Sequence, residues 1–208
     1  MSCEPPSVRK TSRLDPLPAE HSPELKEEFD SFLRTLGFVP NSVLTMQRKP
    51  RLAKAFVGMQ RALWDPESKV DRGLKRLVAH IASRVAADPY SMAHTASGAL
   101  HFGVAPEKLA AMREYRTSDH FTPAERAALD FAVAASATPN AADEKTFAVL
   151  LQHWSEEEIV EIAGVVAMAG FLSRWNVSMA TPLEREPLEV AEKYLAPHGW
   201  DPGVHRRS

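Results

Sequence analysis

The chain has 208 residues, of which 44% are hydrophobic and 25% charged, and its net charge is −2 at pH 7. These values suit one globular domain with an extra arm, and they lack the clustered basic face of a nucleic-acid-binding protein. The single cysteine, Cys3, excludes intrachain disulfides and cysteine-based zinc sites. No apolar leader is visible, and the longest nearly apolar run, 159–172, is too short to cross a bilayer. We therefore expect a cytoplasmic protein with neither a nucleic-acid nor a membrane partner.

Proline and charge dominate the first part of the chain. Residues 1–23 contain five prolines among several charged residues, which is typical of an extended arm. Such an arm is either disordered or wraps a neighbouring subunit. We expect a single domain over 24–196 and a C-terminal tail over 197–208.

Helical patterns begin directly after the arm. Ser22 and Pro23 predict an N-cap followed by proline at the first helical position, and Gly37 predicts the end of that helix. A second helix is expected over about 51–63. Both stretches place apolar residues on one face at the spacing of an α-helix.

The clearest helical pattern lies in the middle of the chain. Apolar residues recur over 74–85 at intervals of three and four, which predicts a helix ending near Ala87. Asp88 and Pro89 then predict the N-cap and first residue of a new helix that reaches about His101. The two helices should form a hairpin.

The remaining patterns are also helical. Pro106 opens a short helix, and Thr122 and Ser155 each begin a capping box with a glutamate three residues later. No stretch alternates with period two over a useful length. We therefore predict an all-α fold without a sheet.

A weak internal repeat appears at an offset of 51 residues. It pairs Asp71 with Thr122 and Leu109 with Val160. Identity between the two copies is slight, so they predict two similar helical hairpins rather than an established duplication.

Four stretches carry a resemblance to a known family: LVAHIASR at 77–84, PYSMAHT at 89–95, FTPAERAAL at 121–129 and GFLSRWN at 170–176. Through them the chain resembles the carboxymuconolactone decarboxylase and alkyl hydroperoxidase D-like (AhpD-like) superfamily over roughly 29–187. It looks most similar to the peroxidase-related branch. The resemblance implies an AhpD-like helical bundle that self-associates as a homo-oligomer (dimer, trimer or hexamer) and takes a small-molecule substrate.

Redox members of this family carry Cys-x-x-Cys, a histidine three or four residues later and a glutamate one helix upstream. The resemblance places Asp88 and Ser91 at the cysteine positions, His94 and Thr95 at the two histidine positions, and Arg76 at the glutamate position. Three of the four relay positions therefore differ. Dithiol peroxidase chemistry is not expected from this chain.

The altered motif still supplies three catalytic candidates. Asp88 keeps a negative charge at a helix start, although an aspartate before proline is also a common plain cap. Ser91 and His94 lie three residues apart and face the same way, but no third residue orients them as a hydrolase triad. His94 could act as an acid or base near neutral pH, or it could be a satisfied polar residue at a helix contact.

Four further residues are candidates for substrate binding. Arg76 could hold an acidic substrate or pair with Asp88. Tyr90, Thr95 and Trp175 could line the same pocket, although tryptophan is more often a core residue.

Histidines next to this motif also raise the question of a metal. His80 and His101 could approach Asp88, but no His-x3-His or Glu-x-x-His pattern is present, so we expect neither metal nor cofactor.

Two classes of function remain. The first is a cofactor-independent acid–base enzyme of the decarboxylase or lyase type, acting on a small molecule that could be acidic. The alternative is a catalytically silent structural or regulatory oligomer. A residual peroxidase-like oxidoreductase is a second alternative. A ligand-sized pocket around His94 would favour the enzyme, and an Asp88 side chain turned onto its own helix cap would favour the silent protein.

Overall fold

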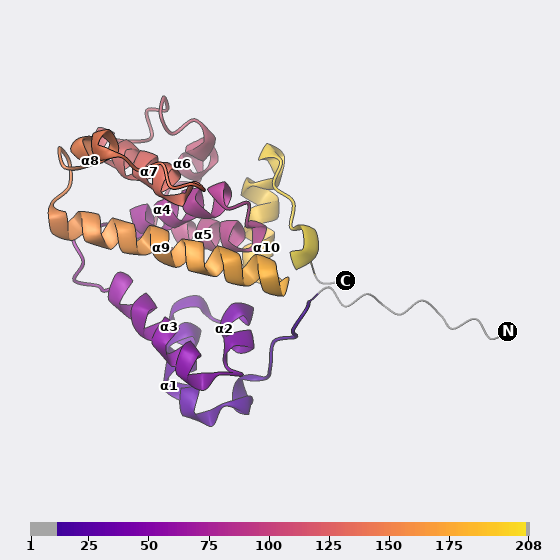
Figure 1. The fold of residues 1–208 in the computed structure, drawn as a ribbon. Coiled ribbons are helices and arrows are strands. Elements are labelled where there is room, and N and C mark those ends of the chain that lie inside the picture. The colour runs from indigo at the N-terminus through magenta and orange to yellow at the C-terminus, as the bar shows by residue number, and fades with distance from the viewer. Residues whose placement is uncertain (1–11, 207–208) are drawn as a thin grey trace.

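The computed structural model describes residues 12–206, and every regular element in that range is a helix (Figure 1). The prediction of an all-α fold is confirmed. The α-helices are α1 (Lys26–Leu36), α2 (Asn41–Met46), α3 (Pro50–Leu63), α4 (Arg72–Val85), α5 (Pro89–His101), α6 (Pro106–Ala110), α7 (Pro123–Ser136), α8 (Glu144–Leu150), α9 (Glu156–Met179) and α10 (Arg185–Tyr194).

Local capping explains where most of these helices begin. The Asp88 carboxylate accepts the Ser91 N–H at 3.2 Å and so starts α5, while Thr122 and Ser155 close complete capping boxes on α7 and α9. The first helix differs from the prediction. Ser22 does not cap it, because its hydroxyl bonds to the Gln47 carbonyl at 3.3 Å, and a 3₁₀ turn precedes α1.

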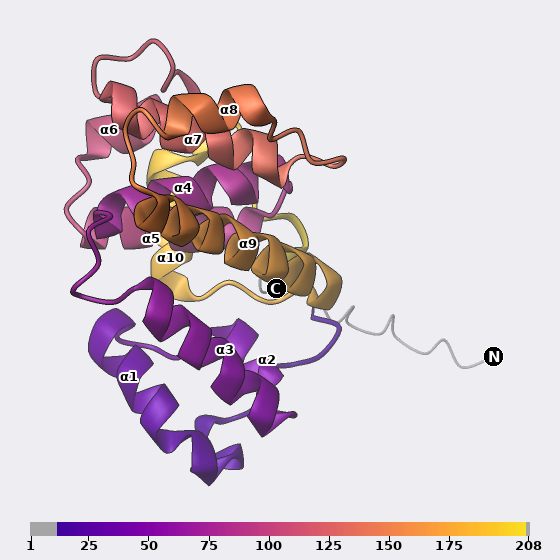
Figure 2. The ribbon, with the colours of Figure 1, turned by 60° about the vertical axis from the view of Figure 1, so that its left-hand side comes forward.

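The helices form two packed parts that share α9. In the main bundle α4 packs against α5, α7 and α9, and α10 packs against α5 (Figure 1). The N-terminal unit of α1, α2 and α3 lies on the other side of α9 (Figure 2). Each part has its own apolar core, and Met168 of α9 belongs to the core of the N-terminal unit. The α9 helix therefore has the N-terminal unit on one side and the main bundle on the other.

The expected hairpin repeat appears in the order of the helices. Asp71 and Thr122, which the offset of 51 pairs, are the N-caps of α4 and α7. The second hairpin is smaller, since α8 has 7 residues where α5 has 13.

Both terminal segments pack onto the domain where the structure describes them. In the arm, Leu17 N–H donates to the Leu44 carbonyl at 3.2 Å; residues 1–11, with Cys3, lie outside the described range. Near the other end, Trp200 Nε1 donates to the Pro89 carbonyl at 3.1 Å and His205 is buried. The segment expected as a tail therefore helps to bury the start of α5 instead of extending away from it.

The α9 helix begins directly after Ser155, as expected, and extends beyond the apolar run 159–172 at both ends. By length and composition it is the one helix of residues 12–206 that could cross a membrane. It begins with three glutamates, Glu156, Glu157 and Glu158, and it packs against α3, α4, α5 and α7. This position is that of a core helix shared by two packed parts.

Candidate functional site

The altered motif lies at the buried N-terminus of α5. Asp88 is 0% exposed, and one of its carboxylate oxygens caps the helix while the other has no hydrogen-bond partner among the described residues. Burial raises the pKa of Asp88, although hydrogen bonds from Ser91 and the nearby His205 partly oppose the increase. The carboxyl group is thus turned onto its own cap.

A ring of buried polar side chains surrounds this cap. Asn176 Nδ2 donates to the Ser91 hydroxyl at 3.3 Å, and Ser173 lies close enough to interact with Asp88. Three further buried oxygens in this region have no partner within 12–206: Ser173 Oγ, Asn176 Oδ1 and Thr181 Oγ1. The sequence suggested Asn176 only as a pocket-wall residue beside Trp175, and it did not suggest Ser173 or His205 as site residues.

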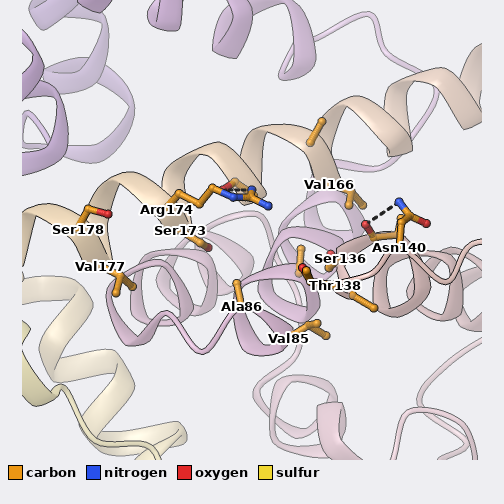
Figure 3. Close-up of a pocket in the computed structure, with 15 residues that line it drawn as sticks. Val85, Ala86, Ser136, Thr138, Asn140, Val166, Ser173, Arg174, Val177 and Ser178 are labelled. Atoms are coloured by element: carbon orange, nitrogen blue, oxygen red, sulfur yellow. Dashed lines mark hydrogen bonds between the residues drawn. The ribbon is translucent and has the colours of Figure 1, made fainter.

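A groove of about 870 Å³ lies outside this cluster, between α9, the end of α4 and the segment after α7 (Figure 3). Small side chains such as Ala86, Ala137 and Ala167 line most of it. Ser173 belongs to its wall, so this residue separates the groove from the buried Asp88 carboxyl.

About one turn after Ser91 on α5, His94 contacts the carboxylate of a residue that the sequence did not suggest, Glu184. His94 Nε2 lies 2.6 Å from Glu184 Oε2, and the Tyr90 hydroxyl donates to Glu184 Oε1 at 2.9 Å. The Asn41 N–H, at the start of α2, also donates to Glu184 Oε1. Glu184 immediately precedes α10, so this cluster joins α2, α5 and α10.

The charges of this cluster follow from its contacts. Burial opposes ionisation of Glu184, yet His94 and the Asn41 N–H hold the pKa of Glu184 below its ordinary value. Burial and the neighbouring Glu184 raise the pKa of Tyr90 well above its ordinary value. Because Nε2–H of His94 donates to a carboxylate, Nδ1 is the nitrogen left to accept a proton. No residue of 12–206 bonds to it.

Aromatic side chains confine the His94 imidazole. The Tyr90 ring stacks on it with centroids 4.4 Å apart, and Phe38 meets it edge-on at 5.9 Å. The His94 side chain keeps 16% of its surface exposed. The imidazole is held in one orientation but still reaches solvent.

Thr95 is a structural residue of α5 in this arrangement. Its hydroxyl donates to the Ser91 carbonyl at 2.7 Å, and His80 Nδ1 approaches it at 3.1 Å. Burial and Arg84 lower the pKa of His80 to about 4, so its imidazole is neutral at pH 7. His80 and Thr95 therefore form an uncharged bridge between α4 and α5.

Arg76 lies far from Asp88. Its side chain packs against Gly98, ten residues after Asp88, which is about 15 Å along α5. The guanidinium stacks over Trp64 at 4.6 Å and near Phe102 at 5.6 Å, and burial lowers its pKa to about 10. The structure therefore does not bring Arg76 to the altered motif.

The remaining candidates are distributed over the fold. Trp175 packs on Phe171 and against the core of the N-terminal unit, and its indole N–H has no partner in 12–206. Within the described residues no three His, Cys, Asp or Glu side chains converge on one point. The structure unites Tyr90 with His94, and Asp88 with Ser91, but leaves Arg76 and Trp175 elsewhere.

Comparisons with known proteins agree with this architecture. The sequence model of the carboxymuconolactone decarboxylase family matches residues 50–134. The crystal structure of the debrominase Bmp8 matches with a TM-score of 0.81 and 36% identity, over 87% of this chain and 97% of that chain. This chain belongs to the carboxymuconolactone decarboxylase and AhpD-like superfamily.

Two further relatives of the superfamily differ in how much they share with this chain. A peroxidase-related protein from Ralstonia eutropha JMP134 has the same fold, with a TM-score of 0.76 and 21% identity over 86% of this chain and 96% of that chain. The Escherichia coli K12 protein YnjA is 31% identical over 78 residues, which are 38% of this chain. Those residues span 43% of YnjA, less than half its length.

Proposed function

We propose that this superfamily member is a thiol-independent acid–base enzyme acting on a small organic molecule, with His94 as the proton-transfer group. The contact of 2.6 Å between His94 Nε2 and Glu184 Oε2 carries the proposal. A carboxylate on one imidazole nitrogen orients the ring, fixes its tautomer and stabilises the protonated form, which leaves the other nitrogen to exchange protons. Glu184 is a positioning residue in this scheme.

Decarboxylation, the reaction in the family's name, illustrates the chemistry. The bond between the carboxylate and the adjacent carbon breaks, CO₂ leaves, and the electron pair stays on that carbon. Protonated His94 Nδ1 then donates its proton to the carbon, and solvent restores the proton. Ser91 lies about one turn before His94 and Asp88 nearly two turns before it, so both would assist only by positioning Tyr90 and His94 on α5.

The Bmp8 comparison bears on the substrate and on the thiol. A cysteine-to-alanine variant of Bmp8 has been crystallised with 2,3,4-tribromopyrrole, a small planar molecule, and matches this chain with 36% identity over 87% of its length. This chain has only Cys3. A cysteine-dependent debromination or peroxidase reaction would therefore need Cys3 or an external thiol, which makes acid–base chemistry the simpler proposal.

The test is hydrogen exchange and CO₂ release by the full chain. We would incubate it in D₂O with carboxymuconolactone and a panel of small carboxylic acids, and follow deuterium incorporation by NMR and CO₂ by infrared spectroscopy. His94→Gln should abolish turnover. Glu184→Gln should lower kcat by about tenfold or more and shift the pH profile, because the ring loses its charged partner. His153→Gln, at an exposed histidine, is the matched control and should change neither kcat nor the pH profile.

Turnover that survives in His94→Gln would refute the assignment of His94. A separate assay with an organic hydroperoxide and a dithiol tests the oxidoreductase alternative. Peroxide reduction that persists in Cys3→Ser would support the oxidoreductase alternative and contradict a purely acid–base role.

The catalytically silent oligomer is the second candidate, and one observation favours it. Asp88 is turned onto its own cap, and His94 is in the wall of neither the groove of about 870 Å³ nor a second cavity of about 520 Å³. In that case the His94–Glu184 contact would only tie α2 and α10 to α5. The absence of turnover over the whole panel, together with a loss of stability in His94→Gln, would support it.

The homo-oligomer remains a proposal as well. Exposed apolar side chains on α9, with Val160 71% and Val177 41% exposed, offer a surface for a second copy. Light scattering on the full chain and on Val160→Lys would test whether that surface holds copies together.

A further inference from the structure

We propose that a second site, between the N-terminal unit and the α4–α5 pair, binds a planar organic carboxylate. The site is a cavity of about 520 Å³, a volume in the range of known small-molecule sites. Helices α1 and α3 form one wall, and α4 with the end of α5 forms the other. Figure 2 shows these two layers facing each other.

The charge of the cavity has one sign. Four arginines line it and no aspartate or glutamate does: Arg34, Arg61, Arg72 and Arg76. Arg61 approaches Glu27 at 3.4 Å on the exposed surface. Within residues 12–206 no carboxylate lies at ion-pair distance from the other three. A cavity of this charge favours an anionic ligand, and guanidinium groups bind a carboxylate through two parallel hydrogen bonds.

Three buried polar atoms in the wall have no protein partner among the described residues. They are Gln60 Oε1, Trp64 Nε1 and Arg76 Nε. Buried donors and acceptors are nearly always paired in native proteins, so these three atoms need a partner, which is either ordered water or a ligand. A carboxylate would accept from the guanidinium N–H groups of Arg76, and a bound water would donate to Gln60 Oε1.

The apolar part of the wall favours a planar organic ligand over an inorganic anion. The Trp64 and Phe102 rings lie against the Arg76 guanidinium at 4.6 and 5.6 Å. Phe32, Leu36 and Val57 also line the cavity. A flat ring would cover these surfaces while its carboxylate meets the arginines, whereas phosphate alone would leave them exposed to water.

Gly98 sets the position of the central arginine. A Cβ atom at this residue would lie 2.8 Å from Arg76 Nε and 2.9 Å from its Cδ, so only glycine lets the guanidinium lie flat against α5. Gly98→Ala therefore displaces Arg76 without removing its charge. It provides a second variant that alters geometry alone.

This inference does not rest on the proposed chemistry of His94. Ligand binding is measured without turnover. Failure of the His94 proposal appears as absent turnover, and failure of the cavity proposal appears as absent benzoate binding. If both proposals hold, the cavity selects a carboxylate ligand, and that ligand binds beside the face of α5 that carries His94.

Isothermal titration of the full chain with benzoate is the experiment. We expect saturable binding with Kd of about 0.1–1 mM, as fits a nine-heavy-atom ligand. Benzamide, which lacks the charge, and cyclohexanecarboxylate, which lacks the flat ring, should each bind at least about tenfold more weakly. Phenyl phosphate, the competing oxyanion, should bind no more tightly than benzoate.

Variants locate the binding. Arg76→Met keeps the aliphatic stem and should weaken benzoate binding by about tenfold or more, and Gly98→Ala should weaken it less. Arg51→Met, at an exposed arginine of α3 outside the cavity, should leave it unchanged. Benzoate should quench the tryptophan fluorescence of the native chain and not that of Trp64→Phe. This measurement locates benzoate in the cavity even if Arg76→Met fails to fold.

The proposal is overturned by any of three results. These are no saturable benzoate binding up to about 10 mM, equal affinity in Arg76→Met and Arg51→Met, or equal binding of benzoate and benzamide. Tighter binding of phenyl phosphate would overturn the carboxylate assignment.

Discussion

The two ends of α5 differ in a way that the sequence conceals. The N-terminal end carries the altered motif, and there Asp88 caps the helix while His94 binds Glu184. The C-terminal end carries no motif, yet Gly98 and Phe102 meet Arg76 in a cavity with unpaired buried polar atoms. Unpaired buried polar atoms occur at both ends within residues 12–206, so it is the four arginines around the cavity that distinguish the C-terminal end.

The difference is also one of charge and access. At the N-terminal end the charged groups are buried carboxylates: Glu184 is bound by His94, Tyr90 and Asn41, and one oxygen of Asp88 caps α5. At the C-terminal end four arginines line a space of about 520 Å³, and within residues 12–206 only Arg61 among them has a carboxylate at ion-pair distance. Buried carboxylates therefore characterise the first end, and arginines around a cavity characterise the second.

Glu184→Ala should have the largest effect on stability. It leaves His94, the Tyr90 hydroxyl and the Asn41 N–H without their shared acceptor in a mostly buried place. We expect the free energy of unfolding to fall by about 3 kcal/mol or more, measured by urea denaturation. Glu186→Ala is the matched control, since Glu186 is exposed and accepts a hydrogen bond from the Ser97 hydroxyl at the surface, and it should cost under about 0.5 kcal/mol. Equal effects of the two would contradict the structural role of the cluster.

His80 should make stability depend on pH. Its pKa falls from 6.5 to about 4 on folding, so the unfolded chain binds the proton more tightly. Stability therefore drops as pH falls from 6.5 towards 4, by about 3 kcal/mol in total. His80→Gln removes the titrating group. The difference in unfolding free energy between the two proteins should shift by that amount across the window, and a constant difference would show that His80 is not buried as described.

Asp88 should behave as a cap with a burial cost. Asp88→Ala loses the hydrogen bond to the Ser91 N–H and should destabilise by about 1–2 kcal/mol. Asp88→Asn keeps a capping oxygen and avoids burying a charge, so it should be neutral or stabilising. Because folding raises the pKa of Asp88, the native chain should lose stability relative to Asp88→Asn as pH rises through that pKa. A destabilised Asp88→Asn at pH 8 would instead indicate that the ionised carboxylate is required.

The sequence predicted the local features of α5 and missed the distant ones. The start of α5 was predictable because capping by Asp88 and Pro89 depends on neighbouring residues. Glu184 was not, since it follows His94 by 90 residues and no short motif surrounds it. Its contact depends on how α10 packs against α5.

The placement of Arg76 next to Asp88 failed for a geometric reason that was available from the sequence. The two helices are antiparallel and turn at residues 86–88, so residues equally far from that turn lie side by side. Arg76 therefore meets Gly98, while Asp88 stays at the turn. The hairpin therefore places position 76 beside the C-terminal half of α5, away from Asp88.

The smallest expected change in stability comes from Arg76→Met, and it sharpens the comparison most. Burial lowers the pKa of Arg76 to about 10, and no carboxylate of the described chain compensates for the buried charge. Its stacking on Trp64 offsets part of that cost, and methionine keeps the apolar stem. We expect the ligand-free variant to be unchanged or up to about 1 kcal/mol more stable by urea denaturation, because removing an unpaired buried cation relieves desolvation. Benzoate should raise the melting temperature of the native chain and not that of the variant. A variant that is destabilised by more than about 1 kcal/mol would mean that Arg76 serves the packing of α4 on α5, which would make the two ends of that helix alike.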